Sequence, residues 1–449
     1  MWEGPLTRLA SRKSARKSTP DQVGGRLSPR KRGEVEQAAL LCLNVSEAAS
    51  GEQAMTYDAI VIGAGPAGAT AALMLAQAGW RVAIVEKAVF PRRKVCGEFI
   101  SATSLPLLHA LGIGESFLAQ AGPEVRRVGL FAGEVTVTAP MPSGSAAPWG
   151  RALGREHLDP MLLEAAVRAG AKLWQPFAVT QLRCGTRGYA CTLDAETGRT
   201  EIVGRLVIVA AGSWERNDWA QVTPAPHRPS DLLAFKAHFA DANLPADLMP
   251  LLAFAGGYGG MVHSDAGRVT LSCCIRRDAL QACRQRHRAP SAGDAVLRHI
   301  QDSCAGVRDA LRSARLAGPW LAAGPIRPGL RRRHAGGIFF VGNIAGEAHP
   351  IVAEGISMAL QSAWLLSRIL VARQDEALTG RARAELGRVY AAAWKRSLGG
   401  RVRAAALYAH LAARPAIGRR LLSIIERFPQ VLTLGARLSG KTTQVAAAL

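Results

Sequence analysis

Three glycines at fixed spacing, Gly63, Gly65 and Gly68, carry the clearest chemical signal in this chain of 449 residues. Residues 58–62 (DAIVI) form a short apolar run before them, and small residues follow them as far as Gly79. The run predicts a buried parallel strand, and the glycines predict a sharp turn into a helix. In such a turn the second glycine lets the backbone approach a pyrophosphate, and the third lets the helix pack closely on the strand. The spacing therefore indicates a dinucleotide-binding site.

An acidic residue, Glu86, ends the second predicted strand at the distance expected for this motif. Its carboxylate can accept hydrogen bonds from a ribose 2′-hydroxyl, and it disfavours a 2′-phosphate. The start of the helix offers N–H groups and a positive dipole end to the phosphates. An ordinary glycine-rich turn is the alternative, and the acid at this distance argues against it. The predicted contacts of this half of the site are Gly63, Gly65, Pro66, Ala67, Gly68, Glu86 and Lys87.

A second glycine-rich segment, residues 337–363 (GIFFVGNIAGEAHPIVAEGISMALQSA), has a related shape. A buried strand runs into Gly342 and Asn343, a turn follows at His349, and Gly355 opens a helix of small residues. Together the two motifs resemble flavoproteins of the aromatic-hydroxylase (p-hydroxybenzoate hydroxylase-like) fold, and within them the geranylgeranyl-reductase-like oxidoreductases. The resemblance covers roughly residues 55–370 and implies FAD as a non-covalently bound cofactor.

The second motif of that family contacts the flavin itself. Its usual acid meets the ribityl chain, and the resemblance implies that Gly355, Ile356 and Ser357 supply N–H groups to the flavin and stabilise negative charge on its reduced form. Here Asn343 follows Gly342 in place of the acid. An asparagine can still accept a hydrogen bond from a hydroxyl, so we expect FAD binding to survive and an Asn343→Asp substitution to be tolerated.

Two further segments match the family. Residues 94–98 (KVCGE) resemble the loop of the reductase branch that lies near flavin and substrate, and Arg155 resembles the leading arginine of a helix that reaches the cofactor. In the same basic loop, Arg92 and Lys94 either contact the pyrophosphate or a substrate headgroup, or are solvated surface charges.

The chain also departs from the family. Ala211 replaces the aspartate of a hydroxylase motif tied to FAD and NAD(P)H, and residues 258–262 (YGGMV) lack the tryptophan and proline of the reductase pocket. The Trp-x-Trp-x-Ile-Pro motif of flavin halogenases is absent, which argues against that reaction. No second GxGxxG unit is present, so we expect any NAD(P)H to dock only transiently.

The candidate catalytic residues are Cys96, Glu98 and His349. Cys96 either protonates a carbanion or is a small buried thiol, and Glu98 either acts as an acid or base or is a solvated loop carboxylate. For His349 a structural hydrogen bond that orients the loop is favoured over proton transfer. Tyr258 and His263 are expected at ordinary sheet positions.

These patterns predict an α/β fold with a Rossmann-type FAD-binding domain, a β-sheet substrate domain and C-terminal helices. Periodicity and turn residues predict helices over residues 104–120 and 155–170, a strand over 232–240 and a hairpin turn at 264–268. We assign residues 55–222 and 320–380 to a discontinuous FAD-binding domain. Residues 223–319, with parts of 101–150, form the substrate domain, and residues 381–449 form the helices. Residues 1–54 are rich in Arg, Lys, Ser and Gly, and we interpret them as a disordered basic tail or an extension upstream of the true start.

Composition excludes some partners. The formal net charge is +22, but 47 of the 56 basic residues are arginine and no recognition motif accompanies them, which favours coding bias over nucleic-acid binding. The eight cysteines show no CxxC pair and no metal-ligand spacing, which predicts reduced thiols, a cytoplasmic protein and no metal site. The most apolar stretch, residues 356–371, contains polar residues and is not expected to span a membrane.

Three functions fit these observations. The favoured one is FAD-dependent reduction or dehydrogenation of an apolar isoprenoid, quinone or polyketide-type molecule, with transient NAD(P)H or another electron donor. The alternatives are a flavin monooxygenase that hydroxylates an aromatic or polyketide substrate, and a membrane-associated electron-transfer flavoprotein. The membrane-associated function is suggested by residues 371–449, which carry fourteen basic and four acidic residues and could therefore bind an anionic membrane surface. Packing of their apolar faces on the flavin domain is favoured over peripheral membrane contact.

Overall fold

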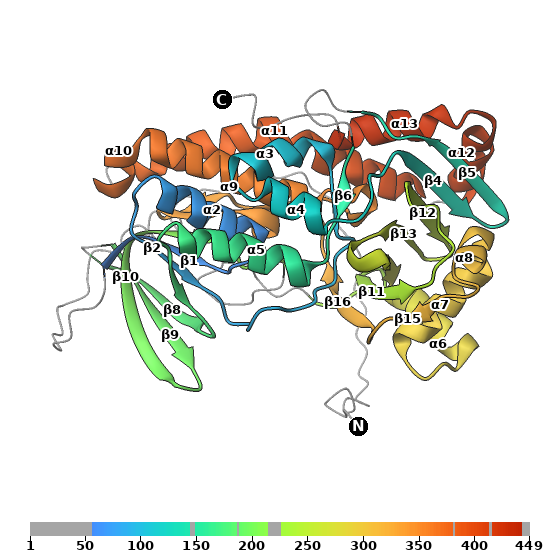
Figure 1. The fold of residues 1–449 in the computed structure, drawn as a ribbon, viewed down its shortest axis with the longest axis horizontal. Helices are drawn as coiled ribbons and strands as arrows, with labels where there is room; N and C mark the ends of the chain where they lie inside the picture. Colours follow the sequence, from blue (N-terminus) through green and yellow to red (C-terminus); the bar gives the residue numbers. More distant parts are fainter. Residues whose placement is uncertain are drawn as a thin grey trace, which may run out of the picture. The chain divides into compact units, whose positions relative to one another are not determined.

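The computed structural model describes residues 56–143, 149–185, 188–213, 226–379, 382–412 and 415–441. The predicted basic tail, residues 1–54, lies outside the described residues. Two large sheets and the helices packed on them make up the described part of the chain (Figure 1). The predicted α/β fold with a Rossmann-type domain is confirmed.

The first sheet contains the parallel strands predicted from the glycine motifs, in the order β18-β19-β10-β1-β2-β7. Ile62, Val209 and Phe340 are register partners at the carboxyl ends of three parallel strands. The loops that follow them therefore begin side by side, which brings the two glycine motifs together. The bounds are β1 Thr56–Ile62, β2 Val82–Val85, β7 Lys172–Trp174, β8 Ala178–Gly185, β9 Gly188–Ala195, β10 Gly198–Val209, β18 His334–Ala335 and β19 Ile338–Phe340, with β8 and β9 forming an antiparallel extension of β10.

Three helices pack together beside this sheet: α2 (Pro66–Gln77), α5 (Arg155–Arg168) and α9 (Gly355–Ala372). Among the described residues, α9 is the one helix long and apolar enough to cross a membrane, but 67% of that stretch is buried inside the fold. It packs against α2 and against α11 (Arg383–Ala412). It is therefore a core helix, as its polar interruptions indicated.

The second sheet has the order β15-β11-β14-β13-β12-β4-β5, with β16 paired to β11. The predicted hairpin around residues 264–268 is confirmed, because it joins two antiparallel strands. Residues 127–140 belong to this sheet, as expected for parts of 101–150, and residues 321–326 also pair here rather than with the nucleotide-binding sheet. The bounds are β4 Arg127–Ala132, β5 Val135–Pro140, β11 Leu232–Ala240, β12 Leu248–Phe254, β13 Gly257–His263, β14 Val269–Arg276, β15 Arg315–Leu316 and β16 Leu321–Ile326.

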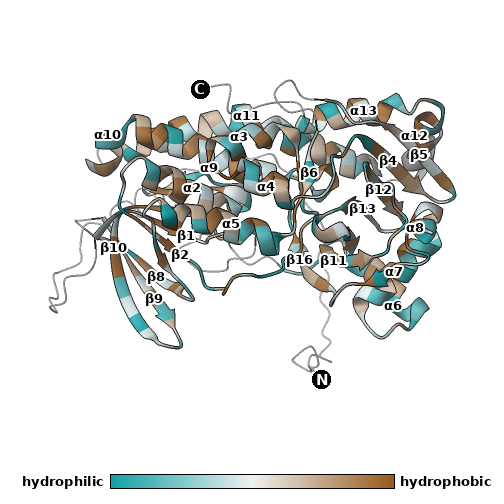
Figure 2. Cartoon of the chain, viewed as in Figure 1, coloured by the Kyte–Doolittle hydropathy of each residue, from teal (hydrophilic) through white to brown (hydrophobic). Residues whose placement is uncertain are grey.

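Three helices cover part of the second sheet, although the sequence indicated mainly strands in this region. They are α6 (Arg277–His287), α7 (Ala292–Ser303) and α8 (Ala305–Ala310). Val296, Ile300 and Val307 pack into one core with sheet residues such as Phe235. Figure 2 shows hydrophilic colouring over much of α6, as expected for a helix that covers a sheet with one face only.

The expected packing on the flavin domain is confirmed for α11, which contacts α9, but it is wrong for α12 (Pro415–Arg427) and α13 (Gln430–Ala436). They lie against β4 and β5 of the second sheet, where Ile425, Leu432 and Ala436 join the core of those strands. The predicted helix over residues 104–120 is broken at Gly112, whose φ is +75°. The remaining strands and α-helices of the described residues are β3 Phe99–Ile100, α3 Leu105–Ala110, α4 Gly114–Gln120, β6 Arg151–Ala152, β17 Gly329–Leu330, β20 Gly346–Glu347 and α10 Gln374–Thr379.

Candidate active site

The three glycines of the first motif meet different surroundings. A Cβ on Gly63, whose φ is +100°, would lie 2.7 Å from the carbonyl oxygen of Ala210, and a Cβ on Gly68 would lie 1.8 Å from that of Gly63. A Cβ on Gly65 would meet only Arg155, whose Nη2 is 3.5 Å away. The protein itself therefore requires Gly63 and Gly68, whereas the space beside Gly65 is left for a ligand. That space and the uncapped start of α2 fit a pyrophosphate.

Glu86 stabilises the backbone of the glycine turn at residues 63–68. Its carboxylate accepts hydrogen bonds from the N–H groups of Ala64 and Ala88, each at 2.9 Å, and its side chain is buried. Pro66 is the first residue of α2, and Ala67 lies against Gly342 of the second motif. One cavity is lined by Gly63, Gly65, Glu86, Lys87, Arg92 and Lys94.

A basic group lies on the other side of this cavity. The buried Arg155 binds Asp159 with two hydrogen bonds of 2.5 and 2.7 Å, and Arg92 lies 3.8 Å from the carboxylates of both Asp159 and Glu86. Burial, together with the charges of the neighbouring Arg155 and Arg92, lowers the pKa of Lys94 to about 8. Arg92, Lys94 and Arg155 thus gather positive charge beside the cavity, which suits the anionic phosphates of FAD.

The second motif has a polarity that the sequence did not reveal. The Asn343 amide donates to Oγ of Ser213 at 3.0 Å and to Oε1 of Glu347 at 3.2 Å. Glu347 also accepts a hydrogen bond from Arg331 at 2.8 Å, although burial raises the pKa of its carboxyl group. Asn343 is therefore a donor to a buried carboxylate here, not only an acceptor for a ribityl hydroxyl.

This geometry reverses the expectation for Asn343→Asp. The new carboxylate would stand beside that of Glu347 and repel it, so we expect FAD binding to weaken by tenfold or more, about 1.4 kcal/mol. FAD titration of the apoprotein measures the change. Asn343→Ala, which removes the donor without adding charge, is the control and should weaken binding less. Tighter FAD binding by Asn343→Asp would contradict this account.

An apolar cavity lies between the second motif and the second sheet, with an empty volume of about 1190 Å³ including its open mouth. Cys96, Glu98 and His349 all line it, so the structure brings the three candidate catalytic residues together. Asn343, Gly355 and Ile356 line it too, while the buried Ser357 accepts a hydrogen bond from the N–H of Ser101. Its apolar walls include Met249, Leu251, Met261, Ile351 and Met358.

Glu98 is neither a solvated loop carboxylate nor a ready proton donor. It is fully buried, and its carboxylate binds Lys236, Nε2 of His238 at 2.9 Å and the hydroxyl of Thr270 at 2.5 Å. Burial raises its pKa, but the His238 hydrogen bond and the charge of Lys236 outweigh this and lower the pKa to about 2. The group is therefore a fixed anion that joins the loop after β2 to strand β11.

Tyr258 is a site residue that the sequence reading underestimated. Its hydroxyl lies 2.7 Å from Nδ1 of His349, and it lines the apolar cavity. Burial lowers the pKa of His349 to about 4 and raises that of Tyr258 well above its usual value, so at neutral pH the imidazole is uncharged and the phenol keeps its proton. His263 lies five residues further along the same strand, so its side chain is on the opposite face of the sheet. Its Nε2 bonds to the carbonyl oxygen of Leu244.

The start of α9 is held by a residue far away in the chain. Lys441 lies 3.0 Å from the Glu354 carboxylate and 3.0 Å from the carbonyl oxygen of Val352. Its ammonium group also sits 4.7 Å from the centre of the Phe99 ring. Arg401 approaches the same carboxylate at 3.8 Å. No local sequence pattern marked Lys441, because its partner lies 87 residues earlier.

A family model described as an FAD binding domain matches residues 56–397, which include both glycine motifs and the whole apolar cavity. The chain belongs to this FAD-binding family. It is accordingly an FAD-dependent flavoprotein of the oxidoreductase and monooxygenase group, as its two glycine motifs predict.

Two of the proteins that this chain resembles in sequence are named as reductases, and they match it over different lengths. The menaquinone reductase of Mycobacterium tuberculosis is 33% identical over 156 residues, which span 35% of this chain and 38% of that protein. Digeranylgeranylglycerophospholipid reductase 1 of Methanopyrus kandleri is 26% identical over 344 residues, 72% of this chain and 82% of that protein. The chain thus spans well under half of the first relative and most of the second.

Solved structures with the same fold include other flavoenzymes. The flavin-dependent brominase Bmp2 has a TM-score of 0.68 at 17% identity, covering 86% of this chain and 94% of that one. The anhydrotetracycline hydroxylase OxyS of Streptomyces rimosus has a TM-score of 0.65 at 19% identity, covering 88% and 76%. At such identities the likeness establishes the aromatic-hydroxylase fold and not the reaction.

Proposed function

We propose that this flavoprotein reduces an apolar small molecule of isoprenoid, quinone or polyketide type. The observation that carries the proposal is the apolar cavity beside the second motif, which holds a protonated phenol next to a neutral imidazole. Two relatives are named as reductases of a quinone and of an isoprenoid lipid, which supports the same class. The electrons come from transiently bound NAD(P)H or from another donor.

Bound FAD, once reduced by that donor, would supply the electron pair, and the chain must supply the proton. Tyr258 is the best-placed donor, because it lines the cavity and burial keeps its hydroxyl protonated. His349 orients that hydroxyl through Nδ1. Cys96, which also lines the cavity, is the second candidate donor. Glu98 contributes by holding the loop in place, since its carboxylate is already fully bound.

Tyr258→Phe should leave FAD binding unchanged and slow the reduction of a polyprenyl double bond by roughly 100-fold, the usual size of a general-acid contribution. Single-turnover oxidation of the reduced protein by substrate measures the rate of substrate reduction. FAD titration shows whether the affinity for the cofactor is unchanged. Tyr57→Phe, on β1 in the first sheet, is the matched control and should keep the rate. An unaltered rate in Tyr258→Phe would transfer the donor role to Cys96.

Anaerobic reduction followed by exposure to oxygen separates this function from hydroxylation. We expect slow reoxidation and no hydroxylated product, with a naphthoquinone and a polyprenyl ester as test substrates. Rapid oxygen consumption coupled to a hydroxylated aromatic product would establish a monooxygenase instead. Slow reoxidation with neither test substrate reduced would favour an electron-transfer protein.

Peripheral contact with anionic membranes is a further part of the proposal. Ile424, Phe428, Leu434 and Leu438 are exposed on α12 and the segment after it, although neighbouring residues pack on β4 and β5. The exposed Arg427 lies among them, which is the composition of a surface that binds lipid headgroups and acyl chains. An apolar substrate would partition into the same membrane.

Vesicle co-sedimentation tests this contact. We expect binding to anionic vesicles at low salt, weaker binding at high salt, and a loss of binding when Phe428 and Leu434 are both replaced by Glu. Both side chains are exposed, so the folded protein should tolerate the change. No binding at low salt would show that these residues are only the outer edge of a packed helix pair.

A further inference from the structure

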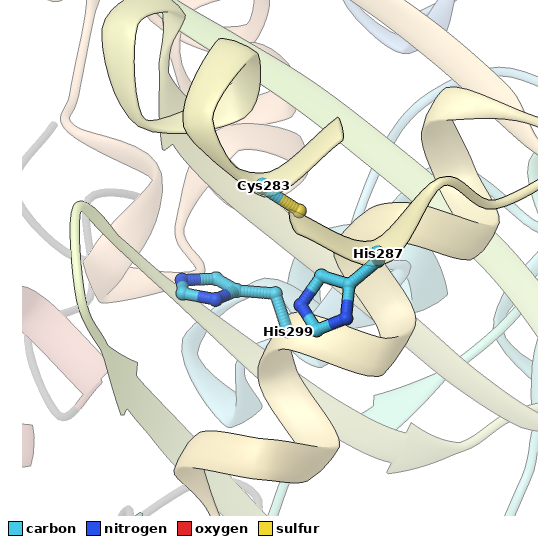
Figure 3. Close-up of side chains that lie close together, drawn as sticks. All are labelled: Cys283, His287 and His299. Atoms are coloured by element: carbon cyan, nitrogen blue, oxygen red, sulfur yellow. The ribbon is translucent and has the colours of Figure 1, made fainter. Parts of the chain in front are cut away.

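A thiol and two imidazoles meet between α6 and α7, on the substrate domain. Cys283 and His287 are four residues apart on α6 and therefore lie on one face, and His299 is on α7. One potential ligand atom from each residue lies within 4.8 Å of the others. Figure 3 shows the sulfur atom and the two rings gathered between the two helices.

His287 has a buried nitrogen with no hydrogen-bond partner among the described residues. Its side chain is only 10% exposed, and the nitrogen is Nε2. The nearest carboxylate oxygen, on Asp302, is 3.8 Å away, beyond hydrogen-bond distance. A buried polar atom without a partner is uncommon in folded proteins, and a bound ion is one of its ordinary explanations.

His299 is oriented as a metal ligand would be. Its Nε2 lies 2.9 Å from the carbonyl oxygen of Ala255, an acceptor only, so this nitrogen carries the proton. The tautomer then leaves the lone pair of Nδ1 free. Metal-binding histidines commonly donate their second ring N–H to a backbone carbonyl in this way, which fixes the ring.

Cys283 completes the donor set from the buried side. Its side chain is 3% exposed, and its thiol donates to the carbonyl oxygen of Ala295 at 2.9 Å. Binding a metal ion would break the S–H bond, form a metal–sulfur bond and release one proton to solvent. Thiolate and imidazole are the ligands that Zn²⁺ prefers, and three protein ligands leave one position for a water molecule or a carboxylate.

We propose that Cys283, His287 and His299 bind a zinc ion that fastens α6 to α7. Asp302 stands near enough to His287 to serve as the fourth ligand after a side-chain rotation, and it already pairs with Arg286 at 3.7 Å. Because α7 packs on β12, whose Met249 and Leu251 line the apolar cavity, the ion would stiffen the wall opposite the flavin motif. The proposal concerns metal binding and stands whatever substrate the cavity takes.

The proposed site has no complete signature in the local sequence. The eight cysteines lack CxxC spacing, and the expectation of no metal site followed from that absence. The spacing Cys-x₃-His on one helix was the available signal, but the third ligand comes from a second helix. Only the packing of α6 on α7 brings His299 to the pair.

Metal titration of the full, FAD-loaded chain tests the proposal. After chelation, the protein is titrated with Zn²⁺ alone and with Co²⁺ alone. We expect one equivalent bound, a near-ultraviolet thiolate-to-cobalt band, and visible absorption typical of tetrahedral Co²⁺. Cys283→Ser should remove the thiolate band, and His287→Ala should weaken Zn²⁺ binding by roughly 100-fold.

Two control variants test whether any loss of metal binding is specific to the three proposed ligands. Cys304→Ser changes another buried cysteine of the same domain, and His227→Ala changes a histidine outside the cluster, so both should bind metal as the parent does. FAD content and circular dichroism show whether each variant is folded, and His299→Ala replaces any variant that is not. Metal binding that is absent in the parent, or equally strong in Cys283→Ser and His287→Ala, would overturn the proposal.

Discussion

Gly65→Val is expected to yield a folded protein without FAD. The Cβ position of Gly65 meets only the Arg155 guanidinium at 3.5 Å, so the apoprotein has room for a side chain. The branched side chain would instead occupy the space that the pyrophosphate needs beside the start of α2. The ratio of flavin to protein absorbance measures the loss, and the melting temperature should match that of the wild-type apoprotein.

Gly68→Ala is the contrasting variant in the same turn. Its Cβ would lie 1.8 Å from the carbonyl oxygen of Gly63, and neither backbone segment can move away without breaking the contact between α2 and β1. We expect this variant to lose both FAD and stable folding. A Gly65→Val protein that carries a full complement of FAD would refute the location of the pyrophosphate.

Glu98→Ala is expected to destabilise the protein by about 3–5 kcal/mol, because it leaves the fully buried Lys236 without a partner for its charge. His238 loses its carboxylate at the same time. Urea unfolding of the apoprotein separates this effect from cofactor binding. Glu201→Ala, which breaks an exposed pair with Arg183, is the control and should change stability by less than about 1 kcal/mol.

The Glu98 carboxylate should make the stability of the folded protein depend on pH, and the sign of that dependence can be predicted. The Glu98 pKa is about 2 in the folded state and close to 4.5 in an unfolded chain, so folding favours the ionised form. The stabilisation is complete above pH 4.5 and declines as the pH falls from there towards 2. Glu98→Gln should lack this part of the pH dependence, and equal slopes for the two proteins would contradict the assignment.

Much of the nucleotide-binding half could be predicted from the sequence, because its signals are local. The spacing of Gly63, Gly65 and Gly68 reflects contacts within one turn, and Glu86 acts on the backbone of that turn. The helix predicted over residues 155–170 spans 155–168, and the strand predicted over 232–240 has those bounds. Both predictions succeeded because periodicity identifies an element and the face that it buries.

The side-chain partners in the substrate half of the site could not be predicted from the sequence. Periodicity shows which face of an element is buried, but only the tertiary structure shows which residues that face contacts. Alternation along β11 placed Lys236 and His238 on one face, but only the fold sets Glu98 against both, across 138 and 140 residues. Asn343 became a donor because the fold brings Glu347 and Ser213 to its amide. The chemistry of a buried polar group depends on its partners, and those partners come from distant parts of the chain.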